Sequence, residues 1–98
     1  MSYKTVAEIR SANQALGHHF FDRSTMEFFR SAVYNDVYGG RYFITSEQFV
    51  ASDGEAFPRE YTIREAHDDG SIETVDLPKF KSLSDAQYRA EILASGIG

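Results

Sequence analysis

The chain has 98 residues, 10 Lys and Arg against 15 Asp and Glu, a formal net charge of −5 and no Cys. This length has room for one domain spanning residues 1–98. The absence of Cys excludes a disulfide framework and a zinc site built on thiolates. No apolar run approaches the ~18 residues of a membrane span, and no secretory signal is visible. We therefore expect a cytoplasmic protein with no membrane partner.

The acidic excess lies in the middle third of the chain. Residues 47–76 hold nine acidic and two basic side chains, a net charge of −7, whereas residues 1–46 and 77–98 each carry +1. A surface of this sign repels phosphate backbones. The sequence therefore predicts no direct binding to nucleic acid and favours a protein partner with a basic surface.

Three segments begin with the capping-box pattern, in which a hydroxyl residue is followed three positions later by Glu or Gln. Their first residues are Thr5, Ser24 and Ser84. The predicted helices cover residues 6–16, 25–32 and 85–94. Gly17 and Gly96 stand where a helix C-terminus commonly needs glycine, so we expect them to end the first and third helices.

Strand-forming residues dominate between the second and third helices. The predicted strands cover residues 33–38, 42–45, 61–65 and 72–75, and residues 48–50 are a candidate continuation of the second strand. Gly39-Gly40 is a hairpin signal between the first two strands. The order of elements predicts an α+β fold, an antiparallel β-sheet of about four strands with two N-terminal helices and one C-terminal helix packed on it. A sheet with helices on one side could cover its other face with a second copy, so a homodimer is a further hypothesis.

The register of the last hairpin can be predicted. A three-residue loop at 68–70 places Ile63 opposite Val75 and Tyr61 opposite Leu77, which collects apolar residues on one face. A two-residue turn would scatter them, so we prefer the longer loop. The same register sets Glu65 opposite Glu73, a like-charge pair that is either solvated beside the turn or neutralised by a partner's cation.

Residues capable of chemistry are present, but their spacing is not typical of a catalytic site. The side chains of His18-His19 diverge because neighbours point apart, and His67 is the only other histidine. No nucleophile motif and no glycine-rich phosphate loop occurs. The sequence therefore predicts a protein that is not an enzyme and that holds no metal and no cofactor.

Phe20-Phe21 and Phe28-Phe29 are two aromatic doublets. Neighbouring side chains on a helix or strand cannot both face inward, so one ring of each doublet should lie near the surface, either beneath a covering loop or at a partner interface. We take Phe21 and Phe28 as candidate anchors. A surface ring could also stack on a nucleotide. The candidate phosphate-binding residues in that case are Arg41, Arg59 and Arg64.

The chain resembles a family of small uncharacterised proteins carried by bacteriophages and plasmids. The resemblance covers roughly residues 5–92, and no catalytic or ligand-binding assignment comes with it. It rests on five segments, which are Gly17-His18-His19-Phe20-Phe21, Met26-Glu27-Phe28-Phe29, Tyr42-Phe43-Ile44-Thr45-Ser46-Glu47, Tyr61-Thr62-Ile63-Arg64-Glu65 and Gly70-Ser71-Ile72-Glu73-Thr74. It implies an accessory protein of a mobile element in a bacterial cytoplasm, a setting in which inhibitors of host defence, such as anti-CRISPR proteins, are common.

Two hypotheses follow. The first is a non-catalytic protein that binds and inhibits a host macromolecule through an acidic face with aromatic anchors. Its expected contact residues are Glu47, Glu65, Asp68, Asp69, Glu73, Asp76, Phe21 and Phe28. The alternative is an oligomeric protein that binds or sequesters a nucleotide signal through the three arginines named above.

Overall fold

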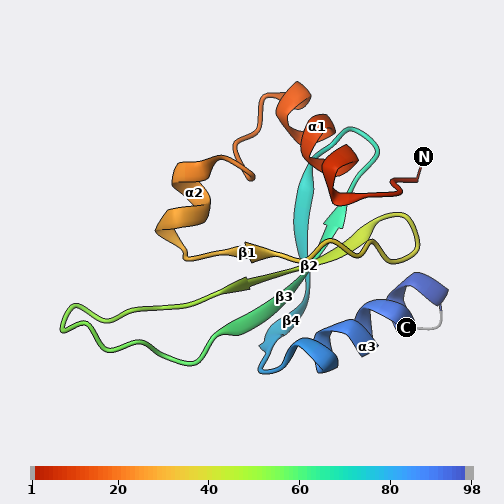
Figure 1. The fold of residues 1–98 in the computed structure, drawn as a ribbon. Coiled ribbons are helices and arrows are strands. Elements are labelled where there is room, and N and C mark those ends of the chain that lie inside the picture. Colours follow the sequence, from red (N-terminus) through yellow and green to blue (C-terminus); the bar gives the residue numbers. More distant parts are fainter. Residues whose placement is uncertain (1, 97–98) are drawn as a thin grey trace.

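The chain forms a four-stranded antiparallel sheet with helices on both sides (Figure 1). The computed structural model describes residues 2–96, except for the side chains of residues 76–78. Its elements are α1 (Val6–Leu16), α2 (Arg23–Phe28), β1 (Ala32–Val33), β2 (Tyr42–Glu47), β3 (Glu60–Ala66), β4 (Ile72–Phe80) and α3 (Leu83–Ser95). The sheet order is β1-β2-β3-β4. The predicted α+β class is confirmed, with two N-terminal helices and one C-terminal helix around the sheet.

The two sides of the sheet have separate apolar clusters. Side chains alternate along a strand, so the neighbours Phe43 and Ile44 of β2 point to opposite faces. Phe43 packs with Ile9 of α1, whereas Ile44 packs with Ala86 and Ala90 of α3. The expectation that the helices cover one side only is wrong, because α3 covers the face that a second copy was expected to occupy.

The first helix follows its capping signal, and the third ends at Gly96 as predicted but begins earlier. The Thr5 hydroxyl accepts a hydrogen bond from the Glu8 amide at 3.2 Å, and α1 ends at Gly17, as predicted. Helix α3 starts earlier than predicted, since Ser82 rather than Ser84 caps it and accepts from the Asp85 amide at 3.2 Å.

Helix α2 departs from its prediction at both ends. It begins at Arg23 after Asp22 and stops at Phe28, four residues before the predicted end. Arg30 adopts a φ of 49°, which turns the chain out of the helix. The Arg59 guanidinium donates a hydrogen bond of 2.8 Å to the Arg30 carbonyl. A contact from a residue distant in sequence thus holds the turn that ends the helix.

Strand β1 is shorter than the predicted strand 33–38. Only Ala32 and Val33 pair regularly with β2, but the Tyr34 amide still donates to the Ile44 carbonyl at 3.0 Å and the Tyr38 amide to the Tyr42 carbonyl at 2.8 Å. Residues 34–38 therefore run beside β2 with only isolated hydrogen bonds to it, and the chain reverses at Gly39-Gly40 as predicted.

The register between β3 and β4 is mostly as predicted. Ile63 pairs with Val75 and Glu65 with Glu73. The expected pairing of Tyr61 with Leu77 is wrong, because a register shift in this part of the ladder brings Tyr61 opposite Phe80.

The β3–β4 turn packs directly on α1. Gly70 has a φ of 95°, and a Cβ atom there would lie 2.4 Å from the Ala12 carbonyl oxygen. The buried Asn13 side chain donates from Nδ2 to the Gly70 carbonyl at 2.9 Å. Only glycine combines a positive φ with this close approach of the two backbones, so Gly70 fixes the position of α1 over the sheet.

Residues 48–59 connect β2 to β3 as a hairpin that projects from the body, which we call the arm (Figure 1). Val50 pairs with Ala56, and the Phe57 amide donates to the Phe49 carbonyl at 2.9 Å. Segment 48–50 therefore extends the second strand beyond the sheet. The radius of gyration is 13.7 Å, against about 12.6 Å for a compact chain of this length. Within residues 2–96, no helix combines the length and apolarity that a membrane crossing requires.

Candidate functional site

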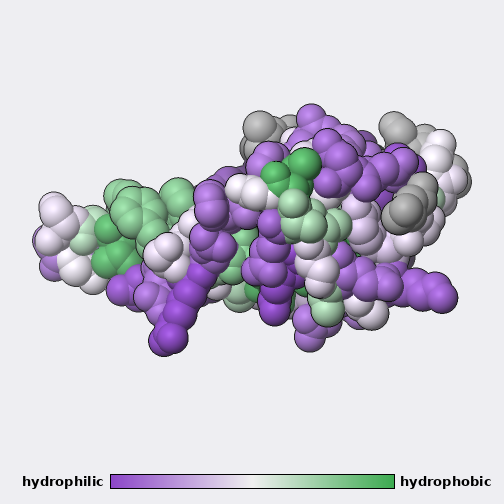
Figure 2. All heavy atoms as spheres, turned by 90° about the horizontal axis from the view of Figure 1, so that it is seen from above, coloured by the Kyte–Doolittle hydropathy of each residue, from purple (hydrophilic) through white to green (hydrophobic). Residues whose placement is uncertain are grey.

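Four phenylalanine rings are exposed where the arm meets the end of α2, and we call them the aromatic surface. Phe28 is 80% exposed, Phe29 51%, Phe49 68% and Phe57 44%. The rings form two pairs, Phe28–Phe29 with centroids 4.8 Å apart and Phe49–Phe57 at 5.4 Å. Figure 2 shows apolar residues gathered on the narrow, projecting end of the molecule. Large rings rarely remain in water at this density without a partner.

Three of the rings, Phe28, Phe29 and Phe49, line a groove of 520 Å³. Phe57 lines a neighbouring hollow together with Phe49. Gln48 contacts both the end of α2 and the arm. Its backbone N–H donates to the Phe29 carbonyl at 3.3 Å, and its side-chain Nε2 donates to the Phe57 carbonyl at 3.1 Å. The end of α2 and the base of the arm are thereby joined through one residue. The groove thus has walls of fixed spacing.

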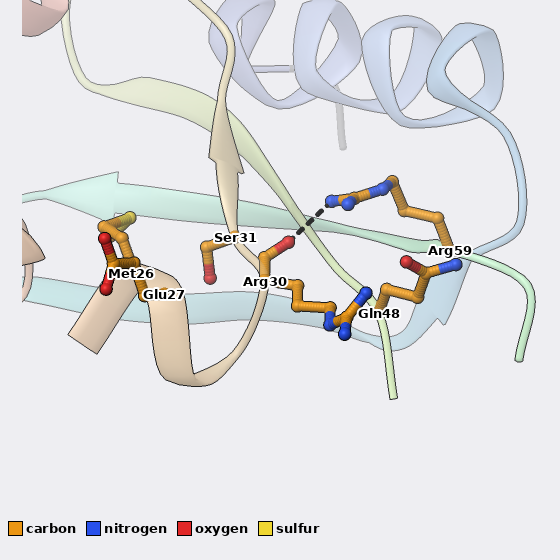
Figure 3. A pocket seen from close by; sticks show the side chains of 6 residues that line it. All are labelled: Met26, Glu27, Arg30, Ser31, Gln48 and Arg59. Carbon is orange, nitrogen blue, oxygen red and sulfur yellow. Dashed lines mark hydrogen bonds between the residues drawn. The ribbon is translucent and has the colours of Figure 1, made fainter. Parts of the chain in front are cut away.

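A second hollow of 450 Å³ lies beside the groove, between α2 and the base of the arm (Figure 3). The Arg59 side chain crosses it and donates to the Arg30 carbonyl, and it also donates to the Ser46 hydroxyl at 2.8 Å. Through Nη1, Arg59 therefore joins the turn after α2 to β2. Arg59 is a structural clamp in this arrangement.

Unpaired charges border the aromatic surface. Among the described residues, the side chains of Arg30, Lys81 and Glu60 make no hydrogen bond or ion pair. Arg30 and Glu60 line the groove, and Lys81 lies on the other side of the arm beside Phe57. The border therefore carries two free cations and one free carboxylate.

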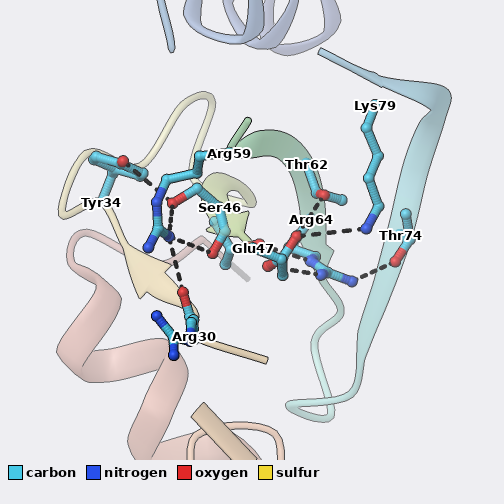
Figure 4. A network of polar contacts seen from close by, with 10 residues as sticks. Arg30, Tyr34, Ser46, Glu47, Arg59, Thr62, Arg64, Thr74 and Lys79 are labelled. Atoms are coloured by element: carbon cyan, nitrogen blue, oxygen red, sulfur yellow. Dashed lines mark hydrogen bonds and ion pairs between the residues drawn. The ribbon is translucent and has the colours of Figure 1, made fainter. Parts of the chain in front are cut away.

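A polar network lies between α2 and the sheet, next to the groove (Figure 4). Arg64 of β3 and Glu47 of β2 are its centre, with side chains 16% and 14% exposed and an N–O distance of 3.3 Å. Arg64 Nε donates to the Thr45 hydroxyl at 3.0 Å, and its guanidinium lies 5.3 Å from the centroid of the Phe20 ring. A largely buried ion pair with this many partners is stable because its donors and acceptors are satisfied.

Glu47 has further partners in this network. The Thr62 hydroxyl donates to Glu47 Oε1 at 2.9 Å, and Lys79 Nζ lies 3.7 Å from the same oxygen. Arg64 also donates to the Thr74 hydroxyl. Glu47 is thus bound within the molecule, on the sheet face that α1 and α2 cover.

The carboxylates expected to share one face are divided between the two ends of the sheet. Glu65 and Glu73 lie on the same face as Ile63, at the end of the sheet where β3 turns into β4, and Asp68 and Asp69 lie in that turn. Glu47 lies at the opposite end, next to the arm. Asp76 falls among the side chains that the structure does not describe. We call the group at the β3–β4 turn the acidic turn, whose members are Glu65, Asp68, Asp69 and Glu73.

Most carboxylates of the acidic turn have local partners. Arg41 Nη1 lies 3.4 Å from Glu65 Oε2. Ser71 donates to Asp69 from its hydroxyl at 2.6 Å and from its amide at 2.9 Å, and these bonds lower the pKa of the Asp69 carboxyl. The negative charge of this end is therefore partly neutralised within the chain.

Glu65, His67 and Glu73 form a cluster that the sequence analysis missed. Strand pairing brings one donor atom of each within 4.8 Å of the others, with His67 Nε2 3.0 Å from Glu73 Oε1. The alternation Glu-x-His on β3 is the signal that could have found it. Histidine and carboxylates can bind divalent cations, but exposed carboxylates often gather without one, and Glu65 already pairs with Arg41.

The two predicted aromatic anchors have different positions. Phe21 is a core residue, 8% exposed, whose ring stacks on Phe43 with centroids 6.0 Å apart, so the prediction that it is an exposed anchor is wrong. Phe28 is exposed, as the first hypothesis requires. Phe49 and Phe57 were not predicted, although both stand beside a turn-forming segment where no core is expected.

The three arginines proposed for a nucleotide phosphate do not converge. Arg41 pairs with Glu65 near the acidic turn, Arg59 binds backbone at the base of the arm, and Arg64 lies in the buried network. These three side chains cannot form one phosphate site in this arrangement. Each of them borders a different hollow, and Arg64 shares its pocket with Lys79.

A model described as "Family of unknown function (DUF7447)" matches residues 5–91, so the chain belongs to that family. This agrees with the resemblance to a family of uncharacterised proteins, and the phage or plasmid origin stays a prediction. No curated protein and no solved structure matches the chain.

Proposed function

We propose that this chain is a non-catalytic binding protein that docks on a protein partner through the aromatic surface. The exposure of four neighbouring rings, three of which line one groove, is the observation that carries the proposal. Aromatic side chains at the centre of an interface commonly supply most of its binding free energy. The groove lined by Phe28, Phe29 and Phe49 is the place where a partner's side chains would insert.

The exposed area is sufficient for an interface core. At roughly 200 Å² per phenylalanine, the four rings expose on the order of 500 Å², which is more than half of the ~800 Å² that each partner buries in a standard interface. The chain's total accessible surface is 6178 Å², against about 5,700 Å² expected for a monomer of its mass. The excess supports a surface that is covered when the protein functions.

The free charges favour a partner with apolar side chains surrounded by carboxylates. Arg30 and Lys81 have no counter-ion among the described residues, whereas the border has a single free carboxylate, Glu60. A carboxylate on the partner would gain a charge-assisted contact with either cation. A partner with carboxylates differs from the basic partner expected from the sequence. The difference arises because the acidic turn lies at the end of the sheet opposite to the aromatic surface.

The biological role proposed here is the one that the family resemblance implies, an accessory protein of a mobile element that inhibits a host macromolecule. A small protein of a mobile element that covers a surface of a host protein would inhibit that protein without chemistry. An anti-defence function is one case of this role. The aromatic surface supports docking itself, and the host protein is identified by the experiment.

Site-specific photo-crosslinking in living cells tests the proposal. A photoreactive phenylalanine analogue replaces Phe28, Phe49 or Phe57, and in a matched control it replaces Tyr88, which is 69% exposed on α3. We expect one and the same partner to be crosslinked from the three positions of the aromatic surface and not from position 88. A purified sample of that partner must then bind the wild-type protein, and Phe49→Ser must weaken the complex at least about tenfold.

Three results would reject the proposal. Crosslinks of equal yield from position 88 would mean that contact is nonspecific. Crosslinks only between two copies of the chain would assign the aromatic surface to a homodimer. An absence of crosslinks from all three positions of the aromatic surface would leave the surface without a partner.

The acidic turn supports a second candidate, binding to a basic partner surface. Glu65 and Glu73 face each other across two strands, a like-charge arrangement that an external cation would relieve. The lysine substitutions Asp68→Lys and Glu73→Lys test it. They should abolish binding if the acidic turn is the interface, and leave binding unchanged if the aromatic surface is.

A further inference from the structure

A pocket of 250 Å³ lies between α2 and the sheet, next to the groove of the aromatic surface. Its walls are apolar, formed by Phe20, Met26 and Phe29. Its polar lining includes Arg64, Glu47 and Lys79. Small-molecule sites commonly have this composition, an apolar chamber with a few polar groups that fix orientation.

The charges in the pocket do not cancel. Glu47 is already held by Arg64 at 3.3 Å and by the Thr62 hydroxyl at 2.9 Å. Lys79 Nζ makes only a loose contact with Glu47, at 3.7 Å, and its side chain is 37% exposed. The pocket therefore has one surplus positive charge, at a position where a ligand can reach it (Figure 4).

We propose that this pocket binds a small aromatic carboxylate. One negative charge balances the surplus of Lys79, and a carboxylate at that point gains a charge-assisted hydrogen bond. The ring of the ligand would lie between Met26 and Phe29, where sulfur–aromatic and ring–ring contacts are favourable. The pocket shares Phe29, Glu47 and Lys79 with the groove of the aromatic surface, but the test of this inference uses small-molecule probes and needs no protein partner.

The presence of Glu47 selects against a phosphate group. A phosphate monoester carries a charge near −2 at neutral pH, and the Glu47 carboxylate would repel it in an environment of reduced dielectric. The chamber is also smaller than the ~300–1,000 Å³ of typical ligand sites. The nucleotide considered in the sequence analysis therefore fits this pocket less well than a one- or two-ring acid.

Titration of the isotope-labelled protein with small molecules, followed by two-dimensional NMR, tests the proposal. The probes are benzoate and indole-3-carboxylate, with neutral indole and adenosine 5′-monophosphate as comparisons. We expect saturable shifts from the two carboxylates, centred on the backbone amides of Phe29, Ser31 and Lys79. Indole and the nucleotide should bind more weakly.

Two matched variants locate the charge contact. Lys79→Met should weaken carboxylate binding about tenfold or more, as expected for the loss of a charge-assisted hydrogen bond. Lys4→Met makes the same chemical change at the exposed start of the chain and should leave the affinity unchanged. Circular dichroism of both variants verifies that the fold is intact.

Several outcomes of the ligand titrations on the wild-type protein would overturn the proposal. Indole binding as tightly as its carboxylate would show that the charge has no role. Tighter binding of the nucleotide would assign the pocket to phosphate. A peptide that ends in phenylalanine and binds more tightly than benzoate would assign it to a partner's C-terminus, and no saturable shift from either carboxylate would leave no site.

Discussion

Phe21 and Phe28 should respond in opposite ways to truncation, although each belongs to a Phe-Phe doublet. Phe21 is 8% exposed, so about 180 Å² of a ~200 Å² side chain is buried. At about 25 cal/mol per Å², with the added cost of a cavity, Phe21→Ala should lower the free energy of unfolding by about 3–5 kcal/mol. That is a large part of the ~5–15 kcal/mol expected for a domain of this size.

Phe28 is 80% exposed, so only about 40 Å² is buried, worth about 1 kcal/mol. Alanine's higher helix propensity offsets roughly half of this loss. We therefore expect Phe28→Ala to change the free energy of unfolding by less than about 1 kcal/mol. Urea unfolding followed by circular dichroism measures both variants against the wild type.

The comparison can refute the division between core and aromatic surface. If Phe28→Ala destabilises the protein as much as Phe21→Ala, Phe28 holds the fold together and is not free for a partner. If Phe21→Ala is nearly neutral, the packing of Phe21 against Phe43 is not as the structure shows it. Either result would remove the main support for the docking proposal.

Three further substitutions test other parts of the account. Gly70→Ala should lower the melting temperature far more than Gly54→Ala, because both positions have positive φ but only Gly70 also contacts α1, where a Cβ would lie 2.4 Å from a carbonyl oxygen. Burial, with smaller contributions from Asp68 and Asp69, raises the pKa of the Tyr3 phenol. The Tyr3 contribution to stability is therefore complete below the unfolded pKa near 10 and is lost as the pH rises through the folded value, so Tyr3→Phe should reduce the alkaline loss of stability in urea titrations. The pKa of the Asp69 carboxyl is lowered in the folded protein, so its contribution to stability is present above the unfolded pKa and is lost as the pH falls through the folded pKa. Ser71→Ala removes a hydrogen bond that lowers this pKa and should therefore reduce the loss of stability in acid.

Local signals in the sequence predicted those elements whose structure is decided locally. The hydroxyl of Thr5 and the left-handed Gly17 fix both ends of α1, and the loop at 68–70 fixes the register of Ile63 against Val75. The end of α2 could not be predicted this way. It depends on a φ of 49° at Arg30, which a side chain 29 positions away in sequence supports.

The candidate site was harder to predict than the fold, because its residues come together only through the arm. Phe49 and Phe57 are single rings in a polar segment, and no periodicity marks them. Net charge counted along the chain was also misleading. It grouped Glu47 with Glu65, although strand pairing places them at opposite ends of the sheet.

The most direct test of the docking proposal is the affinity of the purified partner for three forms of this protein, measured by calorimetry. The forms are the wild type, the double variant Phe49→Ser/Phe57→Ser, and the control Tyr88→Ser. We expect the double variant to bind at least about a hundredfold more weakly, since two central aromatic residues each contribute about 2 kcal/mol or more, and the control to bind as the wild type does. Equal affinity for all three forms would contradict the claim that the aromatic surface is where this protein functions.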